Sequence, residues 1–226
     1  MRLELTKTYL NALPFQNKVQ WASVHAAIWI LLAVLGTGMS LRLDWSISHQ
    51  SFFSDHQYWR GLSSLFAHAN IEHLLSNLFM LAPLSFFLTK YYGAWRTWFS
   101  AITGGVLTNI IVISDYHHEV KLLGISGIVF FMWGYWLAMY FMIERRETWI
   151  RRIMKASMIY IVLLIPSEFN PQVSYLAHGV GNVLGLLFGL MTYALNHKKL
   201  RSYDQWEIIY EPEDFQESAS AHFILE

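Results

Sequence analysis

A serine and a histidine stand at the starts of two long apolar runs in this chain of 226 residues. Ser126 lies in the segment Gly124-Ile125-Ser126-Gly127, and His178 lies in Ala177-His178-Gly179-Val180-Gly181. A serine hydroxyl becomes a nucleophile when a neighbouring imidazole accepts its proton, which is the chemistry of acyl transfer and amide hydrolysis. The pair therefore predicts a hydrolytic site, provided that the fold brings the two side chains together.

The composition around these residues is that of a membrane protein. Hydrophobic residues make up 54% of the chain and charged residues only 14%, a balance that is unusual for a soluble domain. The chain has no cysteine, which excludes disulfides and cysteine metal sites, and its formal net charge of zero gives no nucleic-acid footprint. We expect an all-α protein embedded in the lipid bilayer, with no cofactor and no nucleic-acid partner.

Apolar stretches long enough to cross a bilayer should be helices, because a spanning segment must satisfy its own backbone hydrogen bonds. Six stretches qualify, at roughly residues 21–41, 73–89, 95–114, 126–143, 152–166 and 176–196. The fifth is the weakest, because Arg151, Arg152 and Lys155 crowd its start and Pro166 ends it. The expected regions are a cytosolic N-terminal segment (1–20), a six-helix membrane domain (21–196) and a polar, acidic cytosolic tail (197–226).

The positions of lysine and arginine predict how the six helices cross. Thirteen of the sixteen basic residues fall in the two termini and in the second and fourth connections; the other connections hold only Arg42, Arg60 and Lys121. Basic residues concentrate on the cytoplasmic side of a membrane. We therefore expect both termini in the cytoplasm and the long first loop outside. Because no organellar transit pattern is present, the plasma (inner) membrane is the expected location.

This topology brings further polar side chains to the depth of Ser126. The second, fourth and sixth helices would all enter the membrane from the outer side, and their first turns carry His73 and Asn77, Ser126, and His178 respectively. His73 and Asn77 are four residues apart, so both lie on one helical face. We expect these four side chains to form a single site that opens toward the outer face.

Small residues on the fourth and sixth helices would allow these two helices to pack closely. They recur every four positions along the sixth helix, at Ala177, Gly181, Gly185 and Gly189. Such a stripe lets another backbone approach closely. If the partner is the fourth helix, which carries Gly127 and Gly134, the approach brings Ser126 within reach of His178. Packing alone could also explain the stripe.

Across its six-helix portion, from Trp21 to about Asn196, the chain resembles the rhomboid family of intramembrane serine proteases. The matching motifs occur in family order: Trp59-Arg60 in the first loop, His68-Ala69-Asn70 followed by His73 and Asn77, Gly124-Ile125-Ser126-Gly127, and Ala177-His178 followed by Gly181 and Gly185. The resemblance implies a rhomboid-like bundle with Ser126 as nucleophile, His178 as general base, and His73 with Asn77 lining the oxyanion hole. It also implies single-span membrane proteins as substrates, entering sideways.

The chain departs from the common family pattern in two places. Phe130 stands where many relatives carry a tyrosine that stacks on the catalytic histidine, so the ring face is kept and the hydroxyl is lost. Phe86, Phe87 and Thr89 occupy the region where a glycine pair and a glutamate are often found. No Asp or Glu lies in the fourth or sixth helix, so we expect a Ser-His dyad with an acyl-enzyme intermediate.

Other classes of protein remain open. An inactive rhomboid-like protein would bind and retain or chaperone transmembrane helices, and a channel or transporter would pass a solute. A metallohydrolase would draw on histidines such as His68, His73, His117, His118 and His178. Spacing argues against the metal, because residues five apart on a helix are rotated by about 140° and no His-Glu-x-x-His pair occurs. The sequence predicts no metal site and indicates no oligomeric state.

Overall fold

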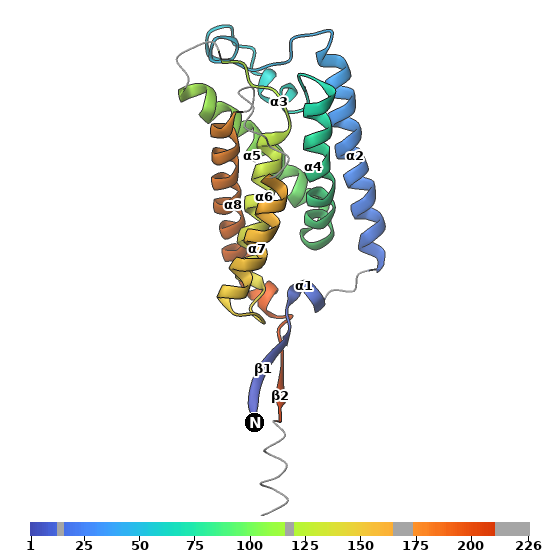
Figure 1. Cartoon of the computed structure of the whole chain (residues 1–226), viewed down its shortest axis with the longest axis vertical. Coiled ribbons are helices and arrows are strands. Elements are labelled where there is room, and N and C mark those ends of the chain that lie inside the picture. Colours follow the sequence, from blue (N-terminus) through green and yellow to red (C-terminus); the bar gives the residue numbers. More distant parts are fainter. Residues whose placement is uncertain (13–15, 116–119, 165–173, 211–226) are drawn as a thin grey trace, which may run out of the picture.

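A computed structural model gives the fold and describes residues 1–12, 16–115, 120–164 and 174–210. Figure 1 shows a bundle of long helices with a thin two-stranded ribbon at one end. In chain order the elements are β1 (Arg2–Lys7), α1 (Tyr9–Ala12), α2 (Gln16–Ser40), η1 (Gln50–Ser54), α3 (Arg60–Ser63), α4 (Ile71–Tyr92), α5 (Ala94–Asp115), α6 (Ser126–Ile143), α7 (Trp149–Leu164), α8 (Tyr175–Arg201) and β2 (Gln205–Ile209).

Five helices among the described residues are long and apolar enough to cross a membrane, judged by length and composition. They are α2 from Lys18 onward, α4, α5, α6 and α8, and each overlaps one of the predicted spans. The predicted fifth span corresponds to α7, which has 16 described residues. Its predicted end at Pro166 lies outside the described residues, as do His117 and His118.

Helix α6 forms the centre of the bundle and contacts α4, α5, α7 and α8 (Figure 1). Of its residues 67% are buried, a larger share than in any other of the five candidate spans. The sequence explains this position, because α6 is apolar on all sides and a helix without a polar face is stable only when surrounded by others. Ser126, the first residue of α6, is therefore held by the best-packed element of the fold.

Glycines bring α6 and α8 into backbone contact, as the four-residue stripe predicts. A Cβ atom added at Gly181 would lie 2.7 Å from the carbonyl oxygen of Gly127, and one at Gly185 would collide with the carbonyl oxygen of Phe131. From the other side, a Cβ atom at Gly134 would collide with the backbone of Asn182. The predicted partnership of the two helices is confirmed.

The two-stranded ribbon is the main element that the all-α expectation leaves out. Strand β1 pairs antiparallel with β2, from Arg2 opposite Ile209 to Lys7 opposite Gln205. The tail expected from residue 197 onward instead continues α8 to Arg201 and then forms β2. At the other end, α2 begins at Gln16, before the expected boundary at Trp21. Residues 211–226, the remainder of the expected tail, lie outside the described residues.

Tyr9 and Asp204 fasten this ribbon to the helices. The Tyr9 hydroxyl donates to the backbone carbonyl of Tyr91 at 2.6 Å, and the Tyr9 ring meets that of Tyr203 edge to face with 5.2 Å between centroids. Asp204 forms an ion pair with Arg145, which follows α6. Both ends of the described chain are therefore held at the same end of the bundle (Figure 1).

Candidate active site

Gly124 shapes the segment that leads into Ser126. Its φ of +123° lies in a region that side chains rarely adopt, and a Cβ atom there would lie 2.8 Å from Cε1 of His73. The Gly124 N–H donates to the carbonyl oxygen of Ser64 at 2.9 Å. Ser126 then begins α6, where the first N–H groups of a helix lack carbonyl partners within it. The segment thus presents the Ser126 side chain and N–H at a helix N-terminus.

His73 and Asn77 lie together in the first turns of α4. Asn70 caps this helix by accepting from the His73 N–H at 2.8 Å. The Asn77 side-chain amide, buried in the bundle, donates to the His73 carbonyl at 2.9 Å. An amide carries two N–H donors, so this bond occupies one of them. The contact between His73 and Gly124 places the start of α4 against the segment that precedes Ser126.

His68, in the loop before α4, is 2% exposed. It lies beside His73 and beside Ile125, the residue that precedes Ser126. Its ring centroid is 5.1 Å from that of His73. Its Nε2 atom is 3.4 Å from the Ile125 backbone nitrogen, and its Nδ1 atom is 2.9 Å from the Thr37 hydroxyl oxygen. Burial, with a smaller effect of His73, lowers the pKa of His68 to about 4, so its ring is neutral at pH 7.

His178 lies in the first turn of α8, which Ser174 caps by accepting from the Ala177 N–H at 3.3 Å. The imidazole stacks on the ring of Phe130, with 4.0 Å between centroids and 15° between planes. One turn further along α8, Gly181 contacts the Gly127 carbonyl. Ser126 and His178 therefore lie at the same end of the closely packed pair α6 and α8.

Among the described residues, Ser126 and His178 are not joined by a hydrogen bond. The bond between a nucleophile and its base is often long or poorly aligned before substrate binds, so this geometry is compatible with a dyad. Within the same ranges, no group of three or more His, Asp or Glu side chains is placed to hold a metal ion.

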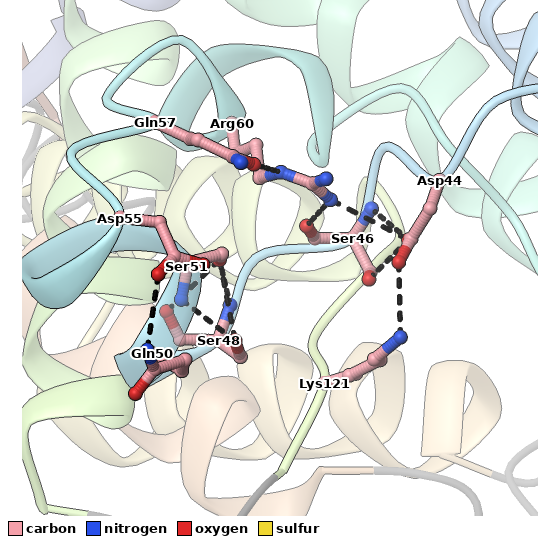
Figure 2. A pocket seen from close by; sticks show the side chains of 9 residues that line it. All are labelled: Asp44, Ser46, Ser48, Gln50, Ser51, Asp55, Gln57, Arg60 and Lys121. Atoms are coloured by element: carbon pink, nitrogen blue, oxygen red, sulfur yellow. Dashed lines mark hydrogen bonds and ion pairs between the residues drawn. The ribbon is translucent and has the colours of Figure 1, made fainter.

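The first loop carries the predicted supporting pair Trp59 and Arg60. The Arg60 guanidinium lies over the Trp59 ring, 5.0 Å from its centroid, and donates to the carbonyl oxygen of Ser46 at 2.7 Å. Arg60 also lies 3.5 Å from Asp44, which accepts from Lys121 at 2.9 Å (Figure 2). Hydrogen bonds from Ser46 and Lys121 hold the pKa of Asp44 well below its usual range.

These contacts tie the first loop to the strand-like segment that leads to Ser126. Ile47 and Leu122 exchange two backbone hydrogen bonds, of 2.9 and 2.8 Å. Beside them lies a polar cavity of about 290 Å³, whose lining side chains are drawn in Figure 2. Asp44 and Lys121 were not singled out in the sequence. The one available signal was that Lys121 is among only three basic residues expected on the outer side, and nothing in the sequence linked it to Asp44.

Comparison with known proteins gives a consistent result. A model of the Rhomboid domain matches residues 55–195. YdcA of Bacillus subtilis (strain 168), provisionally named a rhomboid protease, is 26% identical over 218 residues, which cover 90% of this chain and 99% of YdcA. The rhomboid protease GlpG of Yersinia enterocolitica is 28% identical over 170 residues, covering 71% of this chain and 57% of GlpG. The matched domain contains every predicted site residue, from Trp59 to Gly185.

Proposed function

This chain belongs to the rhomboid family of integral, multi-pass membrane proteins, and on that premise we propose that it is an intramembrane serine endopeptidase. Ser126 is the proposed nucleophile and His178 the proposed general base. The observation that carries the proposal is the contact of α6 with α8, in which Phe130, one turn after Ser126, stacks on His178. A nucleophile and a base from distant parts of the sequence thus share one end of a helix pair.

The proposed reaction has two halves. His178 accepts the Ser126 hydroxyl proton while the oxygen attacks the scissile carbonyl, and the carbonyl oxygen becomes an oxyanion. The C–N bond then breaks, His178 returns the proton to the leaving amine, and Ser126 keeps the acyl group. A water molecule attacks this ester and gives a proton to His178. The bond between the acyl carbon and the Ser126 oxygen then breaks, and His178 returns the proton to Ser126 as the carboxylic acid leaves. Within the described ranges no carboxylate is hydrogen-bonded to His178, so we assign the orientation of its ring to the stack on Phe130.

Three groups are proposed as donors to the oxyanion. The Ser126 N–H is provided by the start of α6, and the Asn77 amide and His73 ring are provided by α4. Support comes from the contact of His73 with Gly124, two residues before Ser126, and from the burial of Asn77 in the same part of the bundle. Preorganised donors in a water-poor site each contribute about 100- to 1,000-fold in rate.

We also propose that α7 is a sixth span. The ribbon holds both ends of the described chain at one end of the bundle, and two ends on one side of a membrane require an even number of crossings. The positions of the basic residues favour the cytoplasm for that side, which would open Ser126 toward the outer face, and the proposed location is the plasma membrane. Single-span membrane proteins that enter sideways are the proposed substrates.

The absence of cysteine makes the topology directly testable. Thr148 immediately precedes α7 and Tyr175 is the first residue of α8, and both positions are exposed sites for a single cysteine. A membrane-impermeant maleimide should react with Tyr175→Cys in right-side-out vesicles and with Thr148→Cys only in inverted vesicles. Reaction of both from one side would show that α7 does not cross.

Activity is tested with a fluorophosphonate probe, which forms a covalent bond with an activated serine. The purified wild type should be labelled, whereas Ser126→Ala should not be, and His178→Ala should be labelled at a small fraction of the wild-type rate. Asn77→Ala should cleave a transmembrane substrate about 100- to 1,000-fold more slowly. Equal labelling of wild type and Ser126→Ala would refute the protease. An unlabelled wild type that still binds transmembrane helices would instead indicate an inactive relative.

A further inference from the structure

His68 lies between helix α2 and the segment that precedes Ser126, and it contacts both through its ring nitrogens. Nδ1 is 2.9 Å from the hydroxyl oxygen of Thr37 on α2, and Nε2 is 3.4 Å from the backbone nitrogen of Ile125. Thr37, like His68, is buried, with 6% of its surface exposed. Both groups are buried, and the backbone of Phe66 is a further hydrogen-bonding neighbour of the His68 ring, so the protons of these groups need partners among them.

Counting protons gives the direction of every bond. The single hydroxyl proton of Thr37 goes to the carbonyl oxygen of Ala33, one turn earlier in α2, at 2.7 Å. The Thr37 oxygen must therefore accept from His68, which places the ring proton on Nδ1. A neutral ring with a proton on Nδ1 has a bare Nε2, and that nitrogen can accept the N–H of Ile125. The three bonds are mutually consistent with one tautomer only.

We propose that Thr37 is a positioning residue, which sets the tautomer of His68 and thereby anchors the backbone of Ile125 beside Ser126. The consequence for the nucleophile rests on the proposed function. In the other tautomer, the His68 Nε2–H would face the Ile125 N–H, so two donors would meet where a hydrogen bond now stands. The neighbouring peptide carries the Ser126 N–H, the proposed oxyanion donor, so a shift at Ile125 moves that donor.

The approach of α2 to this region is close enough to hold such a bond. A Cβ atom at Gly36, next to Thr37, would lie 2.6 Å from the carbonyl oxygen of Phe66 in the loop that carries His68. The backbones of α2 and this loop are thus in contact beside the Thr37 side chain. Thr37 lies far from Ser126 in sequence and in the first span, where a threonine bonded to its own helix is ordinary.

The test uses ¹⁵N-histidine NMR of the full chain, because the two tautomers of a neutral imidazole give distinct ring nitrogen shifts. His68 is assigned as the signal that disappears in His68→Gln. We expect a protonated Nδ1 in the wild type and in Thr37→Ser, which keeps the hydroxyl. In Thr37→Val, the Nδ1–H population should fall and the Nε2–H population should appear. The fluorophosphonate labelling rate of Thr37→Val should fall by roughly 2- to 10-fold, the usual effect of one hydrogen bond.

Thr97→Val is the matched control, since Thr97 is also buried and also donates to the carbonyl one turn earlier in its helix, at 3.0 Å. It should alter neither readout. The proposal is overturned if wild-type His68 carries its proton on Nε2, a result that requires no variant to fold. It is also overturned if Thr37→Val and Thr97→Val slow labelling equally. If the wild type is not labelled at all, the proposed function fails while the tautomer measurement still decides the role of Thr37.

Discussion

The imidazole of His178 lies flat against the phenyl ring of Phe130, with 4.0 Å between ring centroids and 15° between ring planes. Phe130 is one turn after Ser126 on α6, so a single helix carries both the proposed nucleophile and the ring that orients its proposed base. The stack is a contact that can be removed without touching either catalytic group. Its contribution can therefore be measured separately.

Replacing Phe130 with alanine should slow fluorophosphonate labelling by roughly 2- to 10-fold, because a stacked aromatic pair contributes about 0.5–1.5 kcal/mol. Phe130→Tyr keeps the ring face and should label close to the wild-type rate. The neighbouring Phe131 packs edge-on against Phe188, away from His178, so Phe131→Leu serves as the control for lost aromatic packing. Labelling of Phe130→Ala at the wild-type rate would show that the stack does not orient His178.

Gly185→Ala should destabilise the bundle, because the added Cβ would collide with the Phe131 carbonyl, a backbone atom that cannot rotate away. Overpacking of this kind costs about 1–3 kcal/mol. Gly179 is on the same helix, where an added Cβ would meet nothing within 4 Å, so Gly179→Ala should be neutral or slightly stabilising. Thermal denaturation in detergent measures both. Equal melting temperatures for the two variants would contradict the close helix contact.

The ion-pair cluster of Asp44, Arg60 and Lys121 predicts unequal effects for its two basic residues. The Arg60 side chain is 15% exposed and donates to a backbone carbonyl, so Arg60→Ala should cost about 1–3 kcal/mol of stability. Lys121 is 61% exposed and is paired with Asp44 at the surface, so Lys121→Ala should cost less than about 1 kcal/mol. Denaturation of the two variants at low and high salt tests this, and the Lys121 contribution should shrink by the larger fraction with salt. A larger loss from Lys121→Ala would contradict it.

His68 should make stability depend on pH. Burial lowers its pKa from 6.5 to about 4, so between these values the unfolded chain binds a proton that the folded chain excludes. The free energy of unfolding is therefore greatest above pH 6.5 and falls as pH drops toward 4, by about 3 kcal/mol in all. Around the ring, Thr37 and the Ile125 N–H do not titrate, while His73 does.

The measurement is denaturation in detergent from pH 7.5 to pH 4.5, for the wild type and His68→Gln. The variant should lose part of the pH slope in this window, and the remaining slope includes the other histidines of the site, His73 and His178. A wild type of constant stability across the window would contradict the exclusion of the proton at His68.

The helix pair at the site was predictable because its signal is periodic. Glycine at every fourth position describes a helical face whatever the rest of the fold, and Gly181 and Gly185 indeed meet α6. The stack of Phe130 on His178 followed from a resemblance and from a spacing of one turn. Both the glycine period and the one-turn spacing can be read from the sequence without knowledge of the tertiary structure.

Contacts between distant residues had no such signal. Thr37 in α2 looks like any threonine that bonds its own helix, and only the fold shows His68 beside it. The alternation of Leu3 and Leu5 with polar residues is a strand pattern, but its partner is near the other end of the chain. A strand needs that partner to be stable, whereas a membrane helix satisfies its backbone alone.

The pairing of β1 with β2 also sets an order of events during synthesis. Residues Arg2–Lys7 leave the ribosome before every described helix, and their partners Gln205–Ile209 emerge only after all of them. Strand β1 is therefore unpaired while the described helices are being synthesised. An isolated two-stranded ribbon is only marginally stable in water, so its contacts with the helices contribute to its stability. The ribbon can therefore close only after all the described helices have been synthesised, and only when both strands lie on the same side of the membrane.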